Sequence, residues 1–291
     1  MNAQLSQLLA ETSRTFAVCI PVLPPPVERQ VTLAYLLFRI VDTYEDAAVW
    51  TPQQRTEVLQ EFIQLMDERA SSEAFAALPH RFDPLPTTHA GYQNLLTHSP
   101  FVMQEFYALP EAVQQIIWSH LRRTTVGMIH FLSQTNEANQ IRLKSLAELE
   151  HYCYTVAGIV GEMLTELFLF DPKHRRSLPQ ELMRLASSLG NGLQLTNILK
   201  DQEEDQAEGK FYVPHAVARP QMVALAKEKL QDGLRYIKEL EFRKVPNSIA
   251  KACKLPTLWA QATIQQIESF GAGAKISREE LGQIFTSVMA E

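Results

Sequence analysis

Apolar residues along this 291-residue chain recur three or four positions apart, whereas the alternation typical of strands does not recur. Segments such as AVQQIIWSHL and ELMRLASSL have the spacing of helices with one apolar face. Thr51 and Ser145 precede two such segments, each with Gln or Glu three residues later, which is the pattern of a capping box. The pattern predicts helices over residues 27–49, 52–69, 100–107, 111–134, 146–170, 179–205, 220–240, 247–269 and 278–290.

The segments between these helices are short, and none has low complexity. PVLPPPVE and LPHRFDPLPTTHAG are expected to be loops because of their proline content. No internal repeat of solenoid period is present. We therefore expect an all-α fold with a single domain over residues 1–291.

Acidic residues end the first of the long apolar helices. Tyr35, Arg39, Asp42 and Asp46 have the spacing i, i+4, i+7 and i+11, which places them on one helix face. The face combines a phenol, a guanidinium and two carboxylates on a helix that is otherwise apolar. Glu45 adds a third acid beside it.

A second acidic face repeats this arrangement. Gln194, Asn197, Asp201 and Asp205 have the spacing i, i+3, i+7 and i+11 on another apolar helix. For one acid pair alone, a solvated surface would be the simpler interpretation. Like charges four residues apart repel by a few tenths of a kcal/mol. Two such pairs, each with polar neighbours, favour a bound cation.

Mg²⁺ is the cation that these residues fit best. It prefers oxygen ligands and is usually held by one or two carboxylates together with substrate phosphates, and no His or Cys pair has the spacing that softer metals require. Arg39, Lys200 and Lys210 are expected to take the remaining phosphate charge. Departure of a diphosphate leaves a carbocation, which needs a dry cavity and aromatic faces. The aromatic candidates are Phe16, Tyr35, Tyr152 and Tyr212.

Small residues lie close together in the segment YCYTVAGIVG. Ala157 and Gly161 are four residues apart, and Gly158 lies beside that face. Small side chains would let either a neighbouring helix or a long prenyl tail approach the backbone, and the spacing alone leaves both interpretations open.

Composition and charge exclude several classes of function. The net charge of −6 argues against general affinity for nucleic acid or an anionic membrane surface. Cys19, Cys153 and Cys253 are too scattered for a disulfide framework, which favours a reducing compartment. The N-terminal residues lack a signal-peptide pattern, and no apolar run approaches roughly 18 residues. We expect a cytoplasmic protein.

Four motifs together resemble the head-to-head prenyl synthases, which are the squalene, dehydrosqualene and phytoene synthases. They are SRTF, YLLFRIVDTYED, YCYTVAGIVGEML and LQLTNILKDQEED with the following GKFYVP. The resemblance extends from Ser13 to about Lys275. It implies an isoprenoid-synthase helical bundle around one central cavity.

The resemblance also implies roles for individual residues. Asp42, Asp46, Asp201 and Asp205 match the acids that bind Mg²⁺ in catalysis, and Tyr152 matches a tyrosine that handles a proton or shapes the cyclopropyl intermediate. The matching substrate-binding positions are Ser13, Arg14, Phe16, Tyr35, Arg39, Gln194, Asn197, Lys200, Lys210 and Tyr212. Lys at 200 and 210 replaces the arginine common in the family, which keeps the charge but loses the bidentate fork.

The segments DTYED, CKLP and GAGAKISREE resemble the squalene synthases within this family. The implied reaction joins two farnesyl diphosphates through presqualene diphosphate and reduces the product to squalene with NADPH. The GNG at 190–192 is no dinucleotide-binding motif, since no strand precedes it. Phytoene or dehydrosqualene synthesis, arrest at presqualene diphosphate, terpene cyclisation and a non-catalytic interaction protein are the alternatives. We expect a monomer that contacts membranes only peripherally, to release product.

Overall fold

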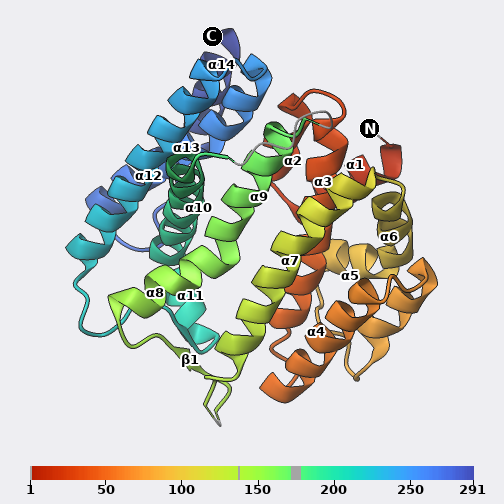
Figure 1. The fold of residues 1–291 in the computed structure, drawn as a ribbon. Helices are drawn as coiled ribbons and strands as arrows, with labels where there is room; N and C mark the ends of the chain where they lie inside the picture. The colour runs from red at the N-terminus through yellow and green to blue at the C-terminus, as the bar shows by residue number, and fades with distance from the viewer. Residues whose placement is uncertain (1, 137, 172–177) are drawn as a thin grey trace. The chain divides into compact units, whose positions relative to one another are not determined.

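The computed structural model describes residues 2–136, 138–171 and 178–291, which divide into two compact units (Figure 1). The first unit runs to Thr135 apart from residues 22–24, and the second contains residues 22–24 and 136–291. The only strands among the described residues are β1 (Ile141–Arg142) and β2 (Lys210–Phe211), which pair in parallel. The prediction of an all-α fold is confirmed.

In the first unit, helix α3 (Val27–Glu45) is central. It packs against five other helices, and its Leu33, Leu36 and Leu37 side chains are completely buried. These neighbours are α1 (Ala3–Thr12), α4 (Pro52–Asp67), α5 (Ala90–Thr97), α6 (Ser99–Tyr107) and α7 (Glu111–Leu132). The short α2 (Phe16–Cys19) and the 3₁₀ segments Ile20–Val22 and Ser72–His80 complete the elements of this part of the chain.

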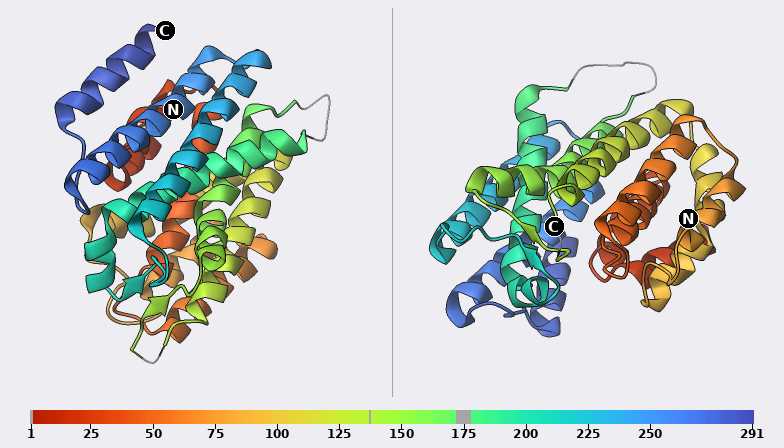
Figure 2. Two further views of the ribbon diagram at one scale, coloured as in Figure 1. Left: turned by 90° about the vertical axis from the view of Figure 1, so that its left-hand side faces the viewer. Right: turned by 90° about the horizontal axis from the view of Figure 1, so that it is seen from below.

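In the second unit, helix α10 (Gln180–Lys200) has the central place. It packs against α8 (Leu146–Cys153), α9 (Ile159–Phe168), α11 (Gln202–Ala207), α12 (Arg219–Phe242) and α13 (Asn247–Phe270). Helices α12 and α13 lie side by side, as Figure 1 and the left view of Figure 2 show. The last helix, α14 (Arg278–Ala290), packs on α13.

The predicted helix starts at Thr51 and Ser145 are confirmed. The Thr51 hydroxyl accepts a hydrogen bond from the Gln54 amide at 3.2 Å, and the Gln54 side chain accepts one from the Thr51 amide at 2.9 Å. Ser145 accepts from the Glu148 amide at 3.2 Å. These side chains satisfy amide groups that the first helical turn leaves unpaired.

Two helices that the sequence pattern predicts as continuous are interrupted. Tyr154–Gly158 forms a π-helical turn between α8 and α9, and Asp201, at φ −97° and ψ 13°, separates α10 from α11. The pattern also missed α1 and α5, which have ten and eight residues. An apolar face spanning two or three turns is too short to be recognised by periodicity.

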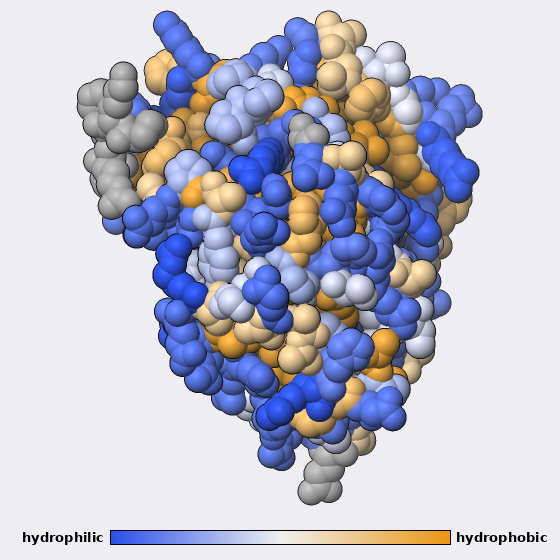
Figure 3. Space-filling model, turned by 90° about the vertical axis from the view of Figure 1, so that its right-hand side faces the viewer, coloured by the Kyte–Doolittle hydropathy of each residue, from blue (hydrophilic) through white to orange (hydrophobic). Residues whose placement is uncertain are grey.

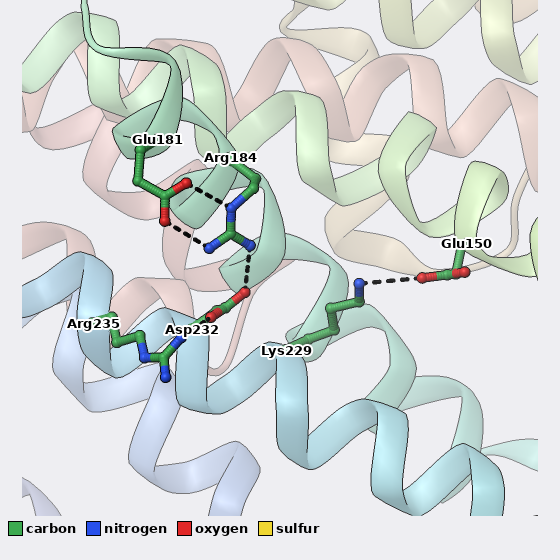
Figure 4. A network of polar contacts seen from close by, with 6 residues as sticks. All are labelled: Glu150, Glu181, Arg184, Lys229, Asp232 and Arg235. Atoms are coloured by element: carbon green, nitrogen blue, oxygen red, sulfur yellow. Dashed lines mark hydrogen bonds and ion pairs between the residues drawn. The ribbon is translucent and has the colours of Figure 1, made fainter.

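A chain of charged residues joins α10 to α12 (Figure 4). Arg184 donates to Asp232 at 2.6 Å and to both carboxylate oxygens of Glu181, and Arg235 donates to the second oxygen of Asp232 at 3.2 Å. Burial alone would raise the pKa of Asp232, but the hydrogen bonds and charges around it, chiefly from Arg184, hold this pKa below its ordinary value.

Hydrophilic side chains cover most of the face drawn in Figure 3, with hydrophobic side chains showing between them. None of the described helices combines the length and hydrophobicity needed to cross a bilayer.

Candidate active site

Helix α3 has one partly exposed face, and the first acid pair lies on it. From Gln30 to Tyr44 every residue is buried except Tyr35, Arg39 and Asp42. The shared face that the spacing predicts is therefore confirmed for these three residues, whereas the exposed Asp46 is the C-cap residue just past the end of the helix. The rest of the helix packs into the core, whereas these three polar or charged side chains remain partly exposed. They are therefore available to a ligand.

Arg39 is held on this face by one acid and two aromatic rings. Its Nη1 lies 3.7 Å from Oδ2 of Asp42, and its guanidinium carbon lies 5.8 Å from the Tyr35 ring centre and 5.2 Å from that of Tyr92. The Tyr35 hydroxyl donates to the Thr12 carbonyl at 2.7 Å. The buried Nε of Arg39 has no hydrogen-bond partner in the described structure. Arg39 thus keeps donor capacity for an anion such as a phosphate.

Asp42 lies in an environment that favours a bound cation. The surrounding protein partly shields this carboxylate from water, which raises its pKa to about 6, with Arg39 opposing this shift and Asp46 adding to it. Asp46 caps the end of α3, and its amide donates to the Asp42 carbonyl at 2.8 Å. Buried Arg55 donates to the Glu45 carbonyl at 2.8 Å, which fixes the last turn before Asp46. A divalent cation would relieve the repulsion between the two carboxylates.

One residue of the SRTF motif, Phe16, lies beside Tyr35. The Phe16 ring centre is 5.6 Å from that of Tyr35, and the Phe16 amide donates to the Ser13 hydroxyl at 2.9 Å. Arg14 is exposed. The structure therefore brings Phe16 and Tyr35 together and uses the Ser13 hydroxyl to fix the turn into α2.

The second acid pair lies where α10 meets α11. The Asp201 amide donates to the Asn197 carbonyl at 2.8 Å, and the Asp205 amide donates to the Asp201 carbonyl at 2.9 Å, so helical bonding continues across the break. Asn197 is exposed, and Gln194, Asp201 and Asp205 are partly exposed. Their buried neighbours are Leu195, Thr196, Ile198 and Leu199. The polar face predicted here is also confirmed.

Lys200 lies within this second acid group. Its Nζ is 3.1 Å from Oδ2 of Asp201 and donates to the Asn197 side chain at 3.3 Å. The Lys200 carbonyl accepts from the Gly273 amide at 2.9 Å, so the segment before α14 is tied to the end of α10. The Lys200 ammonium group is therefore close enough to Asp201 to contact a ligand that Asp201 binds.

Tyr152 and Tyr212 form a stacked pair in the same unit. Their ring centres are 4.6 Å apart, their planes differ by 25°, and both side chains are buried. Tyr212 follows β2, in which Lys210 pairs with Ile141 of β1. The Lys210 Nζ lies 3.1 Å from a Glu208 carboxylate oxygen. The sheet formed by the two-residue strands β1 and β2, which the sequence pattern did not predict, thus places Tyr212 against α8.

The small residues of YCYTVAGIVG serve helix packing. A Cβ atom at Gly161 would lie 2.2 Å from the Ala186 carbonyl oxygen of α10, and one at Gly190 would lie 2.1 Å from the Ala157 carbonyl oxygen. Of the two approaches that the spacing allowed, the structure shows the neighbouring helix. Gly190 and Gly192 of the GNG segment lie inside α10, so they have a packing role and form no dinucleotide-binding turn.

Two residues that contact the polar face or the end of α3 could not be identified from the sequence. Tyr92 reaches Arg39 from α5, a helix too short to show periodicity, and Arg55 reaches the end of α3 from α4. Neither belongs to a recognisable motif, because their contacts depend on how helices pack.

The carboxylates fit Mg²⁺ by their chemistry. The described residues hold no group of three or more His, Cys, Asp or Glu side chains placed to bind a metal ion. Each unit instead provides two aspartates, four residues apart, on a partly exposed face. Mg²⁺ is commonly bound by one or two carboxylates, with water and substrate phosphate completing its coordination. The donor sets therefore suit a metal that arrives with a diphosphate.

Comparison with solved structures identifies the class of fold. The chain superposes on TcSQS in complex with a ligand with a TM-score of 0.79 at 22% identity, covering 97% of this chain and 84% of that one. Squalene synthase HpnC from Alicyclobacillus acidocaldarius gives a TM-score of 0.60 at 18% identity, covering 93% and 97%. The fold is the all-α fold of these synthases.

The chain belongs to the squalene/phytoene synthase family, whose model matches residues 9–220. It is 28% identical to squalene synthase from Homo sapiens over 97% of this chain and 67% of that protein. It is 30% identical to squalene synthase from Eremothecium gossypii over 72% of this chain and 45% of that protein. The chain thus spans between 45% and 67% of the length of these relatives.

Proposed function

We propose that this protein is a prenyltransferase that joins two molecules of farnesyl diphosphate head to head, through presqualene diphosphate, and forms squalene with NADPH. The observation that carries the proposal is the polar face of α3, where Asp42 lies beside an arginine whose buried Nε has no partner in the described structure. Membership of the squalene/phytoene synthase family supports the same reaction class.

The two acid pairs and the basic residues near them have complementary tasks. Mg²⁺, when bound, supplies the positive charge that makes diphosphate a good leaving group. Asp42 and Asp46 are the carboxylates that would hold it in the first unit, and Asp201 and Asp205 are those that would hold it in the second. The phosphate charge left over falls to Arg39, Lys200 and Lys210. Both pairs are needed on this proposal, so residues 1–291 function as one synthase domain.

The aromatic residues and polar side chains act on the rest of the substrate. Stacked Tyr152 and Tyr212 provide buried ring faces beside which a carbocation would be stabilised. On this proposal, proton handling is assigned to the Tyr152 phenol. Phe16 and Tyr35 provide a second aromatic pair. The polar contacts to substrate are assigned to Ser13, Arg14, Gln194 and Asn197.

Squalene is a hydrocarbon with negligible solubility in water, so its release requires an apolar acceptor. We therefore propose that the protein contacts a membrane peripherally. We also propose that it is cytoplasmic and monomeric. Size-exclusion chromatography tests the monomer, and sedimentation with phosphatidylcholine vesicles, with and without turnover, tests the membrane contact.

The reaction is tested by product analysis. Purified protein is incubated with farnesyl diphosphate and Mg²⁺, with and without NADPH, and the extracted lipids are analysed. Squalene formed only with NADPH supports the proposal, and absence of any C30 product contradicts it. A C30 product that does not change with NADPH identifies dehydrosqualene or presqualene diphosphate as the product, and faster turnover of geranylgeranyl diphosphate identifies phytoene synthesis.

A further inference from the structure

The ring of Tyr92 lies over Arg39, yet the reaction proposed above gives this tyrosine no task. Its centre is 5.2 Å from the Arg39 guanidinium carbon, which is closer than the 5.8 Å of Tyr35. Tyr92 is partly buried on α5, outside the acidic motifs. A cation facing an aromatic ring at this distance is attracted to it, and more strongly where water is excluded.

The last turn of α1 fixes the position of α5. A Cβ atom at Gly91 would lie 2.3 Å from the Glu11 carbonyl oxygen, so the helices approach more closely than any other residue at position 91 would allow. The Asn94 side chain donates to the Glu11 carboxylate at 2.6 Å. Tyr92 lies between these two contacts in the sequence, so its backbone has little freedom to shift.

The same turn of α1 also holds the second ring that faces Arg39. The Thr12 carbonyl accepts the hydrogen bond from the Tyr35 hydroxyl at 2.7 Å. Glu11 and Thr12 therefore place both rings through separate contacts. Neither contact involves Arg39 itself, so the rings are in position before any ligand binds.

His89 restrains the Tyr92 side chain further. Its Nδ1 accepts from the Tyr92 amide at 3.3 Å and caps α5. The two ring centres are 4.1 Å apart. The Tyr92 ring thus contacts both His89 and Arg39, which limits its rotation.

We propose that Tyr92 is a positioning residue that holds the Arg39 guanidinium in the orientation in which it binds diphosphate. An arginine side chain loses much rotational freedom on binding, and restraint beforehand reduces that loss. The buried Nε without a partner shows that the guanidinium is already desolvated on one edge. This inference rests on the proposed function, because it assigns the diphosphate to Arg39.

The direct test is binding of inorganic diphosphate in the presence of Mg²⁺, measured by titration calorimetry. Tyr92→Leu is expected to bind about three- to tenfold more weakly than the wild type, as expected for loss of one cation–π contact. Tyr92→Phe, which keeps the ring, should restore most of the affinity. The matched control is Tyr107→Leu, because Tyr107 makes a similar contact to Arg69 at 5.7 Å outside the site. The control should bind like the wild type.

A double-mutant cycle separates positioning from a general structural effect. In an Arg39→Met background, Tyr92→Leu should cause no further loss of binding, whereas a general weakening of the fold would act in both backgrounds. Wild-type affinity in Tyr92→Leu, the same loss in both backgrounds, or no diphosphate binding by the wild type would overturn the inference. Turnover of farnesyl diphosphate is assayed separately: binding that depends on Tyr92 without a C30 product would refute the reaction and leave the positioning role intact.

Discussion

The Nζ atom of Lys200 lies 3.1 Å from Oδ2 of Asp201, so an acid expected to bind Mg²⁺ has a cation beside it in the protein itself. Lys200 also contacts the Asn197 side chain. This arrangement neutralises Asp201 before a ligand arrives. It also places the charge that we propose to bind phosphate next to a carboxylate that we propose to bind Mg²⁺.

Replacement of this lysine should separate its two effects. In Lys200→Met, the KM for farnesyl diphosphate should rise by about tenfold through loss of a charged phosphate contact. The Mg²⁺ concentration for half-maximal rate should fall or stay constant, because the competing cation is gone. Steady-state kinetics at several Mg²⁺ concentrations measure both quantities. An unchanged KM would show that Lys200 does not contact substrate.

The close approach of α9 to α10 makes a prediction about stability. Gly161→Ala places a methyl group 2.2 Å from the Ala186 carbonyl oxygen, so unfolding free energy should fall by about 1–3 kcal/mol or more. Gly282→Ala is the matched control, since nothing lies within 4 Å of its Cβ position on α14. Alanine is the better helix former, so this variant should be more stable by up to about 1 kcal/mol. Urea unfolding followed by circular dichroism compares them, and equal midpoints would contradict the packing.

The buried arginine at the end of α3 should matter to both stability and turnover. Arg55→Met removes the donor to the Glu45 carbonyl, which should lower the unfolding free energy by about 1–3 kcal/mol. Turnover should fall by more than this loss of stability explains, because Arg55 holds Glu45 and Asp46 is the next residue. Arg122→Met removes the exposed pair with Asp67 instead and should change stability by less than about 1 kcal/mol. Full activity in a folded Arg55→Met protein would exclude a role in placing Asp46.

The charged chain in Figure 4 predicts how stability depends on pH. The pKa of Asp232 is lowered in the folded state, so its contribution is present above the unfolded value of about 3.9 and is lost as pH falls through the lower folded value. Asp232→Asn should therefore be less stable than the wild type by about 1–3 kcal/mol at neutral pH. The difference should shrink below about pH 4. Urea unfolding at several pH values measures it, and a difference that is constant with pH would contradict the assignment.

The sequence predicted the polar faces well because helical spacing alone decides which residues share a face. Tyr35, Arg39 and Asp42 needed only a regular α-helix around them. The hydrogen bond from the Asp205 amide to the Asp201 carbonyl keeps these two acids one helical turn apart even where α10 ends. Long helices such as α3 and α10 also show enough apolar turns to be recognised.

Contacts between elements were beyond the sequence pattern. The Tyr152–Tyr212 stack depends on a two-residue sheet, and the contact of Tyr92 with Arg39 depends on the approach of α5 to α1. The Gly161 spacing predicted a close approach without indicating what approaches. Only the packed structure shows that it is the α10 backbone.

We propose that both acid pairs are required for condensation of farnesyl diphosphate, and comparing aspartate variants tests this requirement. Diphosphate release and C30 lipid formation are measured with Mg²⁺ for Asp42→Asn, Asp201→Asn and the control Asp67→Asn, whose side chain binds Trp118 and Arg122. Each of the first two should lose at least about 100-fold in turnover with unchanged helicity, and the control should match the wild type. Turnover retained in either site variant would contradict the claim.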